Sequence, residues 1–267
     1  MNLSITVYNR ICEVVEFLTG KLRLDTQLPQ TGRPLKLTPT EAIAAGLLKQ
    51  RQNVATKKAT YEFLEPDCSY KTFVVSLNRW APWTAVILAF ILRMNREDAH
   101  VVKHTDATDI PVCLNKNGKY HKTMSALASW GKTGKGWFYG LKLHLTSDVK
   151  RKVLALTFTS GNTHDASIMV KLNKELYGIF VADAAYTGDK LAREFSIEHK
   201  RILFAPCRKN MRKIMTGWQY ALYKTRMMVE YNFRNLKQFY GLVTSMPRSI
   251  NGYFAHYLYA LLAYVLA

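Results

Sequence analysis

The amino-acid sequence predicts an α/β fold, in which helices flank a mixed β-sheet and a smaller all-helical region precedes it. Up to about residue 98 the apolar residues recur at helical spacing, whereas beyond it short apolar runs alternate with helical segments. Such alternation is typical of α/β sheets. The sequence therefore predicts two domains, over residues 1–98 and 99–267.

The first domain is expected to contain five helices. Thr38 can cap a helix that begins at Pro39 and ends near Gln50. Apolar spacing predicts the other four over residues 5–18, 57–66, 69–80 and 82–94. Lysines and arginines lie between these helices. The domain therefore suits either a small DNA-binding unit of the helix-turn-helix kind or a plain helical bundle that supports the second domain.

The second domain is expected to contain three strands, then a helix, a strand, a helix, a strand and a helix. The strands are expected over residues 100–106, 137–145, 152–159, 179–183 and 201–205, and the helices over residues 161–176, 187–195 and 218–240. Two of the strands end in an acid, Asp106 and Asp183. Since ligands of open α/β sheets gather at the carboxyl ends of strands, these two carboxylates are expected to lie side by side.

The last of these helices carries an unusual row of polar residues. Residues 218–240 contain neither glycine nor proline before Gly241 and are expected to form one helix. At about 100° per residue, five side chains fall on one face: Tyr223, Arg226, Glu230, Arg234 and Lys237. One acid in a row of cations suits a helix that holds a metal ion and phosphate oxygens. The alternative is a solvated face with ion pairs between neighbouring turns.

The chain is strongly basic, with 38 lysines and arginines against 19 acids and a net charge of +19. This excess favours a polyanionic partner, and nucleic acid is the expected one for a cytosolic chain. A membrane is not expected, because the apolar run 253–267 is short for a span and should form a buried helix. The cysteines lie far apart without zinc-ligand spacing, so we expect reduced thiols and no zinc site: Cys12, Cys68, Cys113 and Cys207.

Asp106, Asp183 and Glu230 form a candidate metal site. Three carboxylates that lie close together repel one another unless cations neutralise them, and Mg²⁺ and Mn²⁺ prefer oxygen-only ligation. Two such ions about 3.5–4 Å apart would activate a water or a 3′-hydroxyl for in-line attack on a phosphodiester. Each acid also has a structural interpretation: a strand-end cap for Asp106, with Asp109 as a rival ligand, a turn residue for Asp183, and an arginine pair for Glu230.

These residues resemble the Asp, Asp, Glu triad of the DDE transposases of bacterial insertion sequences, and the order of elements is similar to the ribonuclease-H-like fold. One large group of these enzymes has a signature of Tyr, two residues, Arg, three residues, Glu, six residues, Lys. This chain matches it at Tyr223, Arg226, Glu230 and Lys237. The segments 106–113, 161–165 (Gly-Asn-Thr-His-Asp) and 183–189 are similar to further family motifs. The resemblance covers most of residues 100–267.

The resemblance implies a transposase and endonuclease that cleaves transposon ends and transfers the strands into target DNA. It implies Asp106, Asp183 and Glu230 as catalytic ligands of two Mg²⁺ or Mn²⁺ ions, a homodimer on double-stranded DNA, and a bacterial cytoplasmic, nucleoid-associated location. DNA contacts are expected from basic loops and from the last helix: Tyr223, Arg226, Arg234, Lys237, Lys132, Lys135, Arg208, Lys209 and Lys213. Nearby tryptophans could stack on a base or lie in the core: Trp130, Trp137 and Trp218.

Several alternatives stay open on the sequence alone. His164 either supports the active site or belongs to a capped turn. The chain could be a related nuclease that cuts without joining, or a DNA-binding protein on an inactive scaffold. A ribonuclease also remains open, because a fold does not fix a function.

Overall fold

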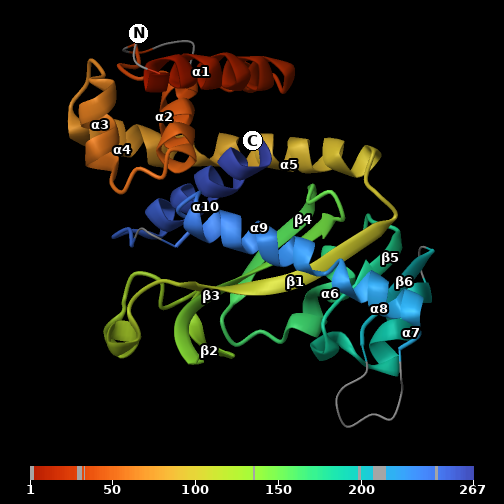
Figure 1. Cartoon of the computed structure of the whole chain (residues 1–267). Helices are drawn as coiled ribbons and strands as arrows, with labels where there is room; N and C mark the ends of the chain where they lie inside the picture. Colours follow the sequence, from red (N-terminus) through yellow and green to blue (C-terminus); the bar gives the residue numbers. More distant parts are fainter. Residues whose placement is uncertain are drawn as a thin grey trace. The chain divides into compact units, whose positions relative to one another are not determined.

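A computed structural model describes residues 3–28, 32, 34–134, 136–197, 200–206, 215–243 and 246–267. They divide into two compact units (Figure 1), one with residues 1–91 and 235–267 and the other with residues 92–234. These units differ from the predicted domains 1–98 and 99–267, because the C-terminal helix belongs with the N-terminal helices. The functional assignment of the two domains stays a prediction.

The described part of the first unit is helical, as predicted. Its helices are α1 (Leu3–Lys21), η1 (Leu24–Gln27), α2 (Pro39–Arg51), α3 (Lys57–Leu64), α4 (Tyr70–Arg79), the first part of α5 (Ala81–Glu97), the last turn of α9 (Met227–Gln238) and α10 (Ile250–Val265). The predicted start of α2 is confirmed. Glu41 N–H donates to the Thr38 hydroxyl at 3.2 Å, and Thr38 N–H donates to the Glu41 carboxylate at 2.8 Å. This capping box satisfies free N–H groups of the first turn.

Helix α2 is the centre of this unit. It is buried along most of its length, because α1, α4 and α10 pack against it. Helix α10 is also largely buried, as the sequence predicted. No single described helix is long and apolar enough to cross a membrane, and α4 and α5 meet that test only as a pair bent by 40°. The described cysteines, Cys12, Cys68 and Cys113, form no disulfide.

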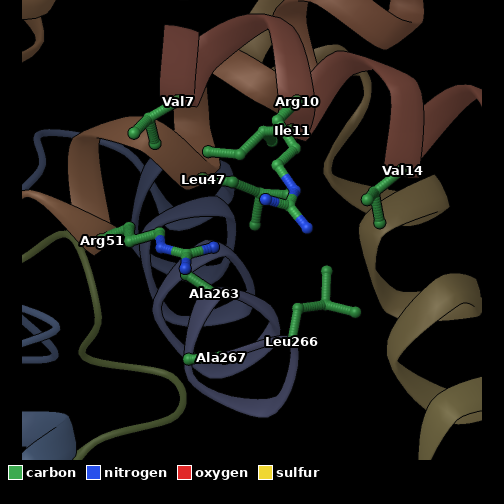
Figure 2. Close-up of a pocket in the computed structure, with 9 residues that line it drawn as sticks. All are labelled: Val7, Arg10, Ile11, Val14, Leu47, Arg51, Ala263, Leu266 and Ala267. Atoms are coloured by element: carbon green, nitrogen blue, oxygen red, sulfur yellow. The ribbon is translucent and has the colours of Figure 1, made fainter. Parts of the chain in front are cut away.

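A hollow of about 450 Å³ opens between α1, α2 and α10 (Figure 2). Apolar side chains such as Ile11, Leu47 and Leu266 form its walls, and Arg10 and Arg51 contribute the only charged side chains among its nine lining residues. The hollow lies within the helical unit, whereas the acids predicted for catalysis belong to the other unit.

Gly46 of α2 is needed where that helix meets α10. A Cβ atom at this position would lie 2.6 Å from the ring of Tyr259, whose hydroxyl donates to the Leu77 carbonyl at 2.7 Å. We expect Gly46→Ala to lower the free energy of unfolding by about 1–3 kcal/mol through overpacking. Gly20→Ala in α1 is the control, because nothing lies within 4 Å of its Cβ position, and it should stabilise by up to about 1 kcal/mol. Urea denaturation distinguishes them, and equal effects would contradict the packing argument.

The second unit is built on a six-stranded mixed sheet, which confirms the predicted α/β fold. Its strands are β1 (Val102–Pro111), β2 (Ser129–Thr133), β3 (Gly136–Asp148), β4 (Val153–Ser160), β5 (Gly178–Val181) and β6 (Arg201–Phe204). β3 is antiparallel to β1, β2 and β4, whereas β1, β5 and β6 run parallel. The resulting order is β2-β3-β1-β5-β6, with β4 also paired to β3, and it suits the predicted ribonuclease-H-like arrangement. The sequence did not predict β2, which pairs with the first part of β3.

Strand β1 does not end at Asp106, and that part of the prediction is wrong. The strand continues to Pro111 because β3 pairs with it as far as Gly140. Its parallel partner β5 pairs only with residues 102–104. Asp106 therefore lies inside a strand, just past the point where its parallel neighbour ends.

Helices follow the strands, but the first of them is shorter than expected. In place of the predicted helix 161–176, the chain forms η3 (Asp165–Ile168) and α6 (Met169–Leu172), and η4 (Ala184–Tyr186) and α7 (Asp189–Ile197) come after β5. A buried apolar cluster joins the sheet to these segments. Its members include Leu154, Phe180 and Phe195.

The predicted single helix 218–240 is also wrong, because the chain forms α8 (Gly217–Lys224) and α9 (Met227–Gln238) instead. The Thr225 hydroxyl donates to the Leu222 carbonyl at 2.6 Å and lies 2.8 Å from His104 Nε2. Because the Thr225 hydroxyl donates its only hydrogen to Leu222, His104 Nε2 donates to the Thr225 oxygen. Around Arg226 the backbone bonds span three residues, as in a 3₁₀ turn. A distant strand residue therefore fixes the helix break.

Candidate active site

Asp106 and Asp183 lie at the same level of two adjacent parallel strands, each just beyond the point where the pairing of β1 with β5 ends. His104 of β1 pairs with Val181 of β5, and each acid stands two residues beyond this pair. The Asp106 carboxylate accepts a hydrogen bond from Ala107 N–H at 2.8 Å, and that of Asp183 accepts one from Ala184 N–H at 2.5 Å. The structure thus brings these two acids together.

Arg226 joins the first acid to the third. Its Nη1 donates to Asp106 Oδ2 at 2.8 Å, and its Nη2 donates to Glu230 Oε1 at 2.5 Å. Glu230 lies in the first turn of α9, directly after the helix break. The Asp106 side chain is 20% exposed and that of Glu230 is 50% exposed. The structure therefore gathers Asp106 and Glu230 around one guanidinium, close to Asp183.

The electrostatics of Asp106 reflect this crowding. Burial raises the pKa of Asp106 to about 6, Arg226 and the Ala107 amide oppose that shift, and Asp183 and Asp165 add to it. Burial of a charged carboxylate is costly unless cations compensate it. In the part of the chain that the structure describes, no three His, Cys, Asp or Glu side chains are arranged to hold a metal ion. Arg226 is the cation in contact with Asp106.

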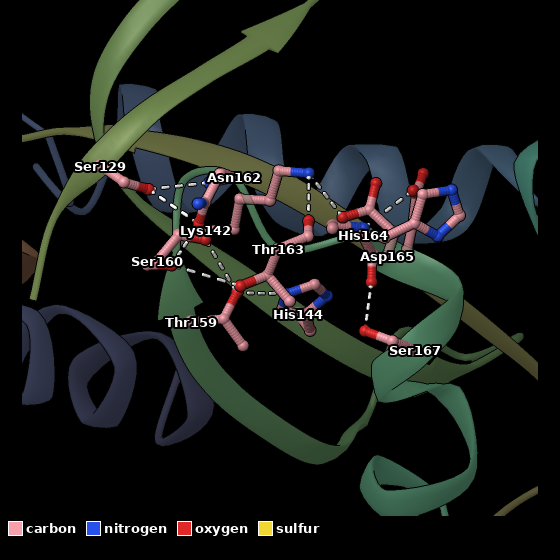
Figure 3. Close-up of polar contacts among 12 residues, drawn as sticks. Ser129, Lys142, His144, Thr159, Ser160, Asn162, Thr163, His164, Asp165 and Ser167 are labelled. Carbon is pink, nitrogen blue, oxygen red and sulfur yellow. Dashed lines mark hydrogen bonds and ion pairs between the residues drawn. The ribbon is translucent and has the colours of Figure 1, made fainter.

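A fourth acid, Asp165, belongs to the same region, because its charge also raises the pKa of Asp106. Lys142 Nζ donates to Asp165 Oδ1 at 2.8 Å and to the Thr163 carbonyl at 2.9 Å (Figure 3). The turn that begins at Asp165, η3, packs against η4, which follows Asp183. Asp165 could have been found from the sequence, because it lies in segment 161–165, which is similar to a family motif. Lys142 could not, because its position next to Asp165 depends on the register of the sheet.

Two further residues belong to the turns next to the acids, His164 before Asp165 and Tyr186 after Asp183. The main-chain oxygen of His164 accepts hydrogen bonds from the hydroxyl and the N–H of Ser167, at 2.6 and 3.1 Å. Tyr186 is buried, and among the described residues its hydroxyl has no hydrogen-bond partner. Burial and the charges of Asp106, Asp165 and Asp183 raise the pKa of that phenol. The Tyr186 hydroxyl therefore lies in the negative electrostatic potential of these three acids.

A hollow of about 300 Å³ has Asp165 among its lining residues. Its lining includes Trp130, Trp137, Lys132 and Lys142. Lys132 Nζ lies 5.7 Å from the centre of the Trp137 ring, and the Trp137 and Trp218 residues are 58% and 65% exposed. Burial in the core, one of the two interpretations of these tryptophans, is therefore wrong for Trp137 and Trp218, whereas Trp130 is half-buried.

The other residues predicted to contact DNA are spread over several elements. Tyr223 lies in α8, and its ring centre is 5.9 Å from the Arg226 guanidinium. Arg234 is exposed on α9, 5.1 Å from the Tyr231 ring, and Lys237 lies in the last turn of α9. Four lie outside the described residues: Lys135, Arg208, Lys209 and Lys213.

Comparison with known families gives one match. A family model described as a transposase DDE domain matches residues 96–250. This span is more than half of the chain and contains all six strands, α8, α9 and the three predicted acids. No curated protein and no solved structure matches the chain significantly.

Proposed function

Because this chain belongs to the transposase DDE domain family, we propose that it cleaves the ends of a transposon and joins them to target DNA with Asp106, Asp183 and Glu230. The family membership confirms the resemblance seen in the sequence, whereas the narrower Tyr-Arg-Glu-Lys group stays a prediction. One observation carries the proposal. Three acids that are far apart in the chain gather near Arg226, beside the point where the pairing of β1 with β5 ends.

The chemistry of the acids' donor atoms suits a hard divalent cation. They offer carboxylate oxygens, which are the ligands that Mg²⁺ and Mn²⁺ prefer. The pKa of Asp106 is raised to about 6 although Arg226 is in contact with it. This shift supports the view that Arg226 compensates the negative charge of Asp106 only in part. Asp106, Asp183 and Glu230 would hold the ions, two of them in our proposal. When bound, such ions supply positive charge to the attacking and leaving oxygens of a phosphodiester.

The chain itself would bind and orient the DNA. With a net charge of +19, it is suited to neutralise phosphates of double-stranded DNA. We assign phosphate contacts to the predicted set of cations and to Tyr223, including the four residues outside the described part. Exposed Trp137, next to Lys132, suits stacking on an unpaired base. His164 would act through the turn that places Asp165. We further propose that a homodimer holds the two transposon ends.

Asp183→Asn tests this function. The asparagine oxygen can still accept the Ala184 hydrogen bond, but the charge that would hold a cation is gone. We expect cleavage to fall by more than about 100-fold, since losing even an outer-shell partner of a metal ligand costs about 10–100-fold. Nicking of supercoiled plasmid with Mn²⁺ measures cleavage. Joining of a labelled duplex with a free 3′-hydroxyl to plasmid measures strand transfer.

Asp189→Asn is the matched control, because it removes the same charge from an exposed acid at the start of α7, and it should leave both activities unchanged. Undiminished cleavage by Asp183→Asn would overturn the proposal. Cleavage without joining by the wild type would favour the related nuclease. DNA binding without cleavage would favour the inactive scaffold.

A further inference from the structure

Arg226 lies between two of the proposed metal ligands, Asp106 and Glu230, and donates to both. The Arg226 and Asp106 side chains are only 18% and 20% exposed, so water shields their contact little. The pair with Glu230 joins residues four apart in the chain, Arg226 directly before α9 and Glu230 in its first turn, and such local pairs are common. The pair with Asp106 bridges 120 positions of the chain, so it is a feature of the fold.

The surrounding structure holds the guanidinium in this place. Arg226 follows Thr225, whose hydroxyl is bonded to the Leu222 carbonyl and to buried His104. The Arg226 guanidinium also lies 5.9 Å from the centre of the Tyr223 ring, within reach of cation–π attraction. The guanidinium is therefore held by the residues around the helix break, unlike the guanidinium of a freely moving surface arginine.

The guanidinium and a metal ion need the same carboxylates. An ion bound to Asp106 and Glu230 would stand at or against the Arg226 guanidinium, and two cations at contact distance repel each other. The neighbouring acid Asp165 has its own cation in Lys142. Arg226 is therefore the cation that Asp106 and Glu230 share.

We propose that Arg226 is a built-in competitor of the metal, which neutralises Asp106 and Glu230 in the metal-free protein and must leave them before divalent cations bind. This inference rests on the proposed function. It also connects two roles of one residue. Once displaced, the guanidinium has lost its carboxylate partners and can bind a phosphate of the DNA, the contact predicted from the sequence. Metal and DNA would then each favour the binding of the other.

Calorimetric titration of Mn²⁺ into the DNA-free full chain tests this competition. We expect Arg226→Gln to bind Mn²⁺ about tenfold more tightly than the wild type, a change of about 1.4 kcal/mol. Lys224→Gln is the matched control, because it removes one positive charge two residues away, where the ammonium lies 4.6 Å from the Tyr220 ring. It should bind Mn²⁺ within about twofold of the wild type, since exposed charges act weakly through solvent.

Arg226→Lys provides a second test in case Arg226→Gln does not fold. It keeps one charge but has a single ammonium in place of the planar fork, so its Mn²⁺ affinity should fall between those of the wild type and Arg226→Gln. Circular dichroism checks the fold of each protein without metal. Unchanged or weaker Mn²⁺ binding by Arg226→Gln and Arg226→Lys would overturn the competition and leave the proposed function standing. Absence of Mn²⁺ binding in the wild type and all variants would overturn both.

Discussion

Replacing Asp106 with asparagine is expected to stabilise the metal-free protein at pH 7. Burial raises the pKa of Asp106 to about 6, so the folded protein binds this proton more tightly than the unfolded chain does. Its contribution to stability is therefore greatest below about pH 4 and is lost as the pH rises to about 6. At pH 7 the ionised carboxylate costs up to about 3 kcal/mol, at 1.36 kcal/mol per pKa unit. Urea denaturation in EDTA at pH 4.5 and pH 7.5 should show the gain for Asp106→Asn only at pH 7.5.

The same substitution is expected to abolish metal-dependent cleavage, so stability and activity should change in opposite directions. Asp109→Asn is the control. Asp109 lies three residues further along β1, opposite Lys142 in the sheet, and is the rival ligand that the sequence left open. Cleavage should survive in Asp109→Asn. Loss of cleavage only in Asp109→Asn would assign the ligand role to Asp109.

Mild acid is expected to unfold the protein through three buried histidines. Burial lowers the pKa of His104 and His144 to about 4 and that of His256 to about 3. Each ring is neutral in the fold and gains a proton more readily when unfolded. Their stabilising contribution is complete above about pH 6.5 and is lost as the pH falls towards 4. At pH 4.5 the loss is about 2.7 kcal/mol for each histidine, which together approaches the whole stability of a typical domain.

The pH dependence of urea denaturation measures this effect. Between pH 6.5 and pH 4.5 unfolding should be accompanied by uptake of about three protons, offset by the opposite contribution of Asp106. His256→Gln isolates one site. His256 Nε2 lies 2.9 Å from the Gly241 carbonyl, and Nδ1 lies 2.9 Å from Gln50 Nε2. This variant should lose about a third of the acid sensitivity. A stability that stays constant over this pH range would contradict the account.

Local signals predicted the parts of the fold that local interactions determine. The start of α2 follows from Thr38 and Glu41, three residues apart, whose side chain and backbone bonds form within one turn. The alternation of strands and helices also predicted the mixed sheet. Strand β2 escaped prediction because its residues, Ser-Trp-Gly-Lys-Thr, contain no apolar run. It is recognisable through its pairing with β3 rather than through its own pattern.

The errors come from interactions between distant residues. Asp106 looked like the end of a strand because the apolar alternation stops there, but pairing with β3 extends the strand to Pro111. The helix 218–240 had no glycine or proline to interrupt it, yet His104, 121 positions away, bonds Thr225 at the break. No local pattern encodes such a bond.

The same division applies to the candidate site. Asp106, Asp183 and Glu230 could be proposed from their motifs and spacing, whereas the pairing of Lys142 with Asp165 depends on the folded sheet. Arg226 was expected to contact DNA. In the fold its guanidinium contacts two of the acids, Asp106 of β1 and Glu230 of α9.

The central claim is that Asp106, Asp183 and Glu230 jointly hold divalent cations. A crystal structure with Mn²⁺, measured at the manganese absorption edge, tests it most directly. The account predicts anomalous peaks with carboxylate oxygens of all three acids within about 2.6 Å, and an Arg226 guanidinium that has left Asp106. Manganese bound elsewhere, with Arg226 still bridging Asp106 and Glu230, would contradict it.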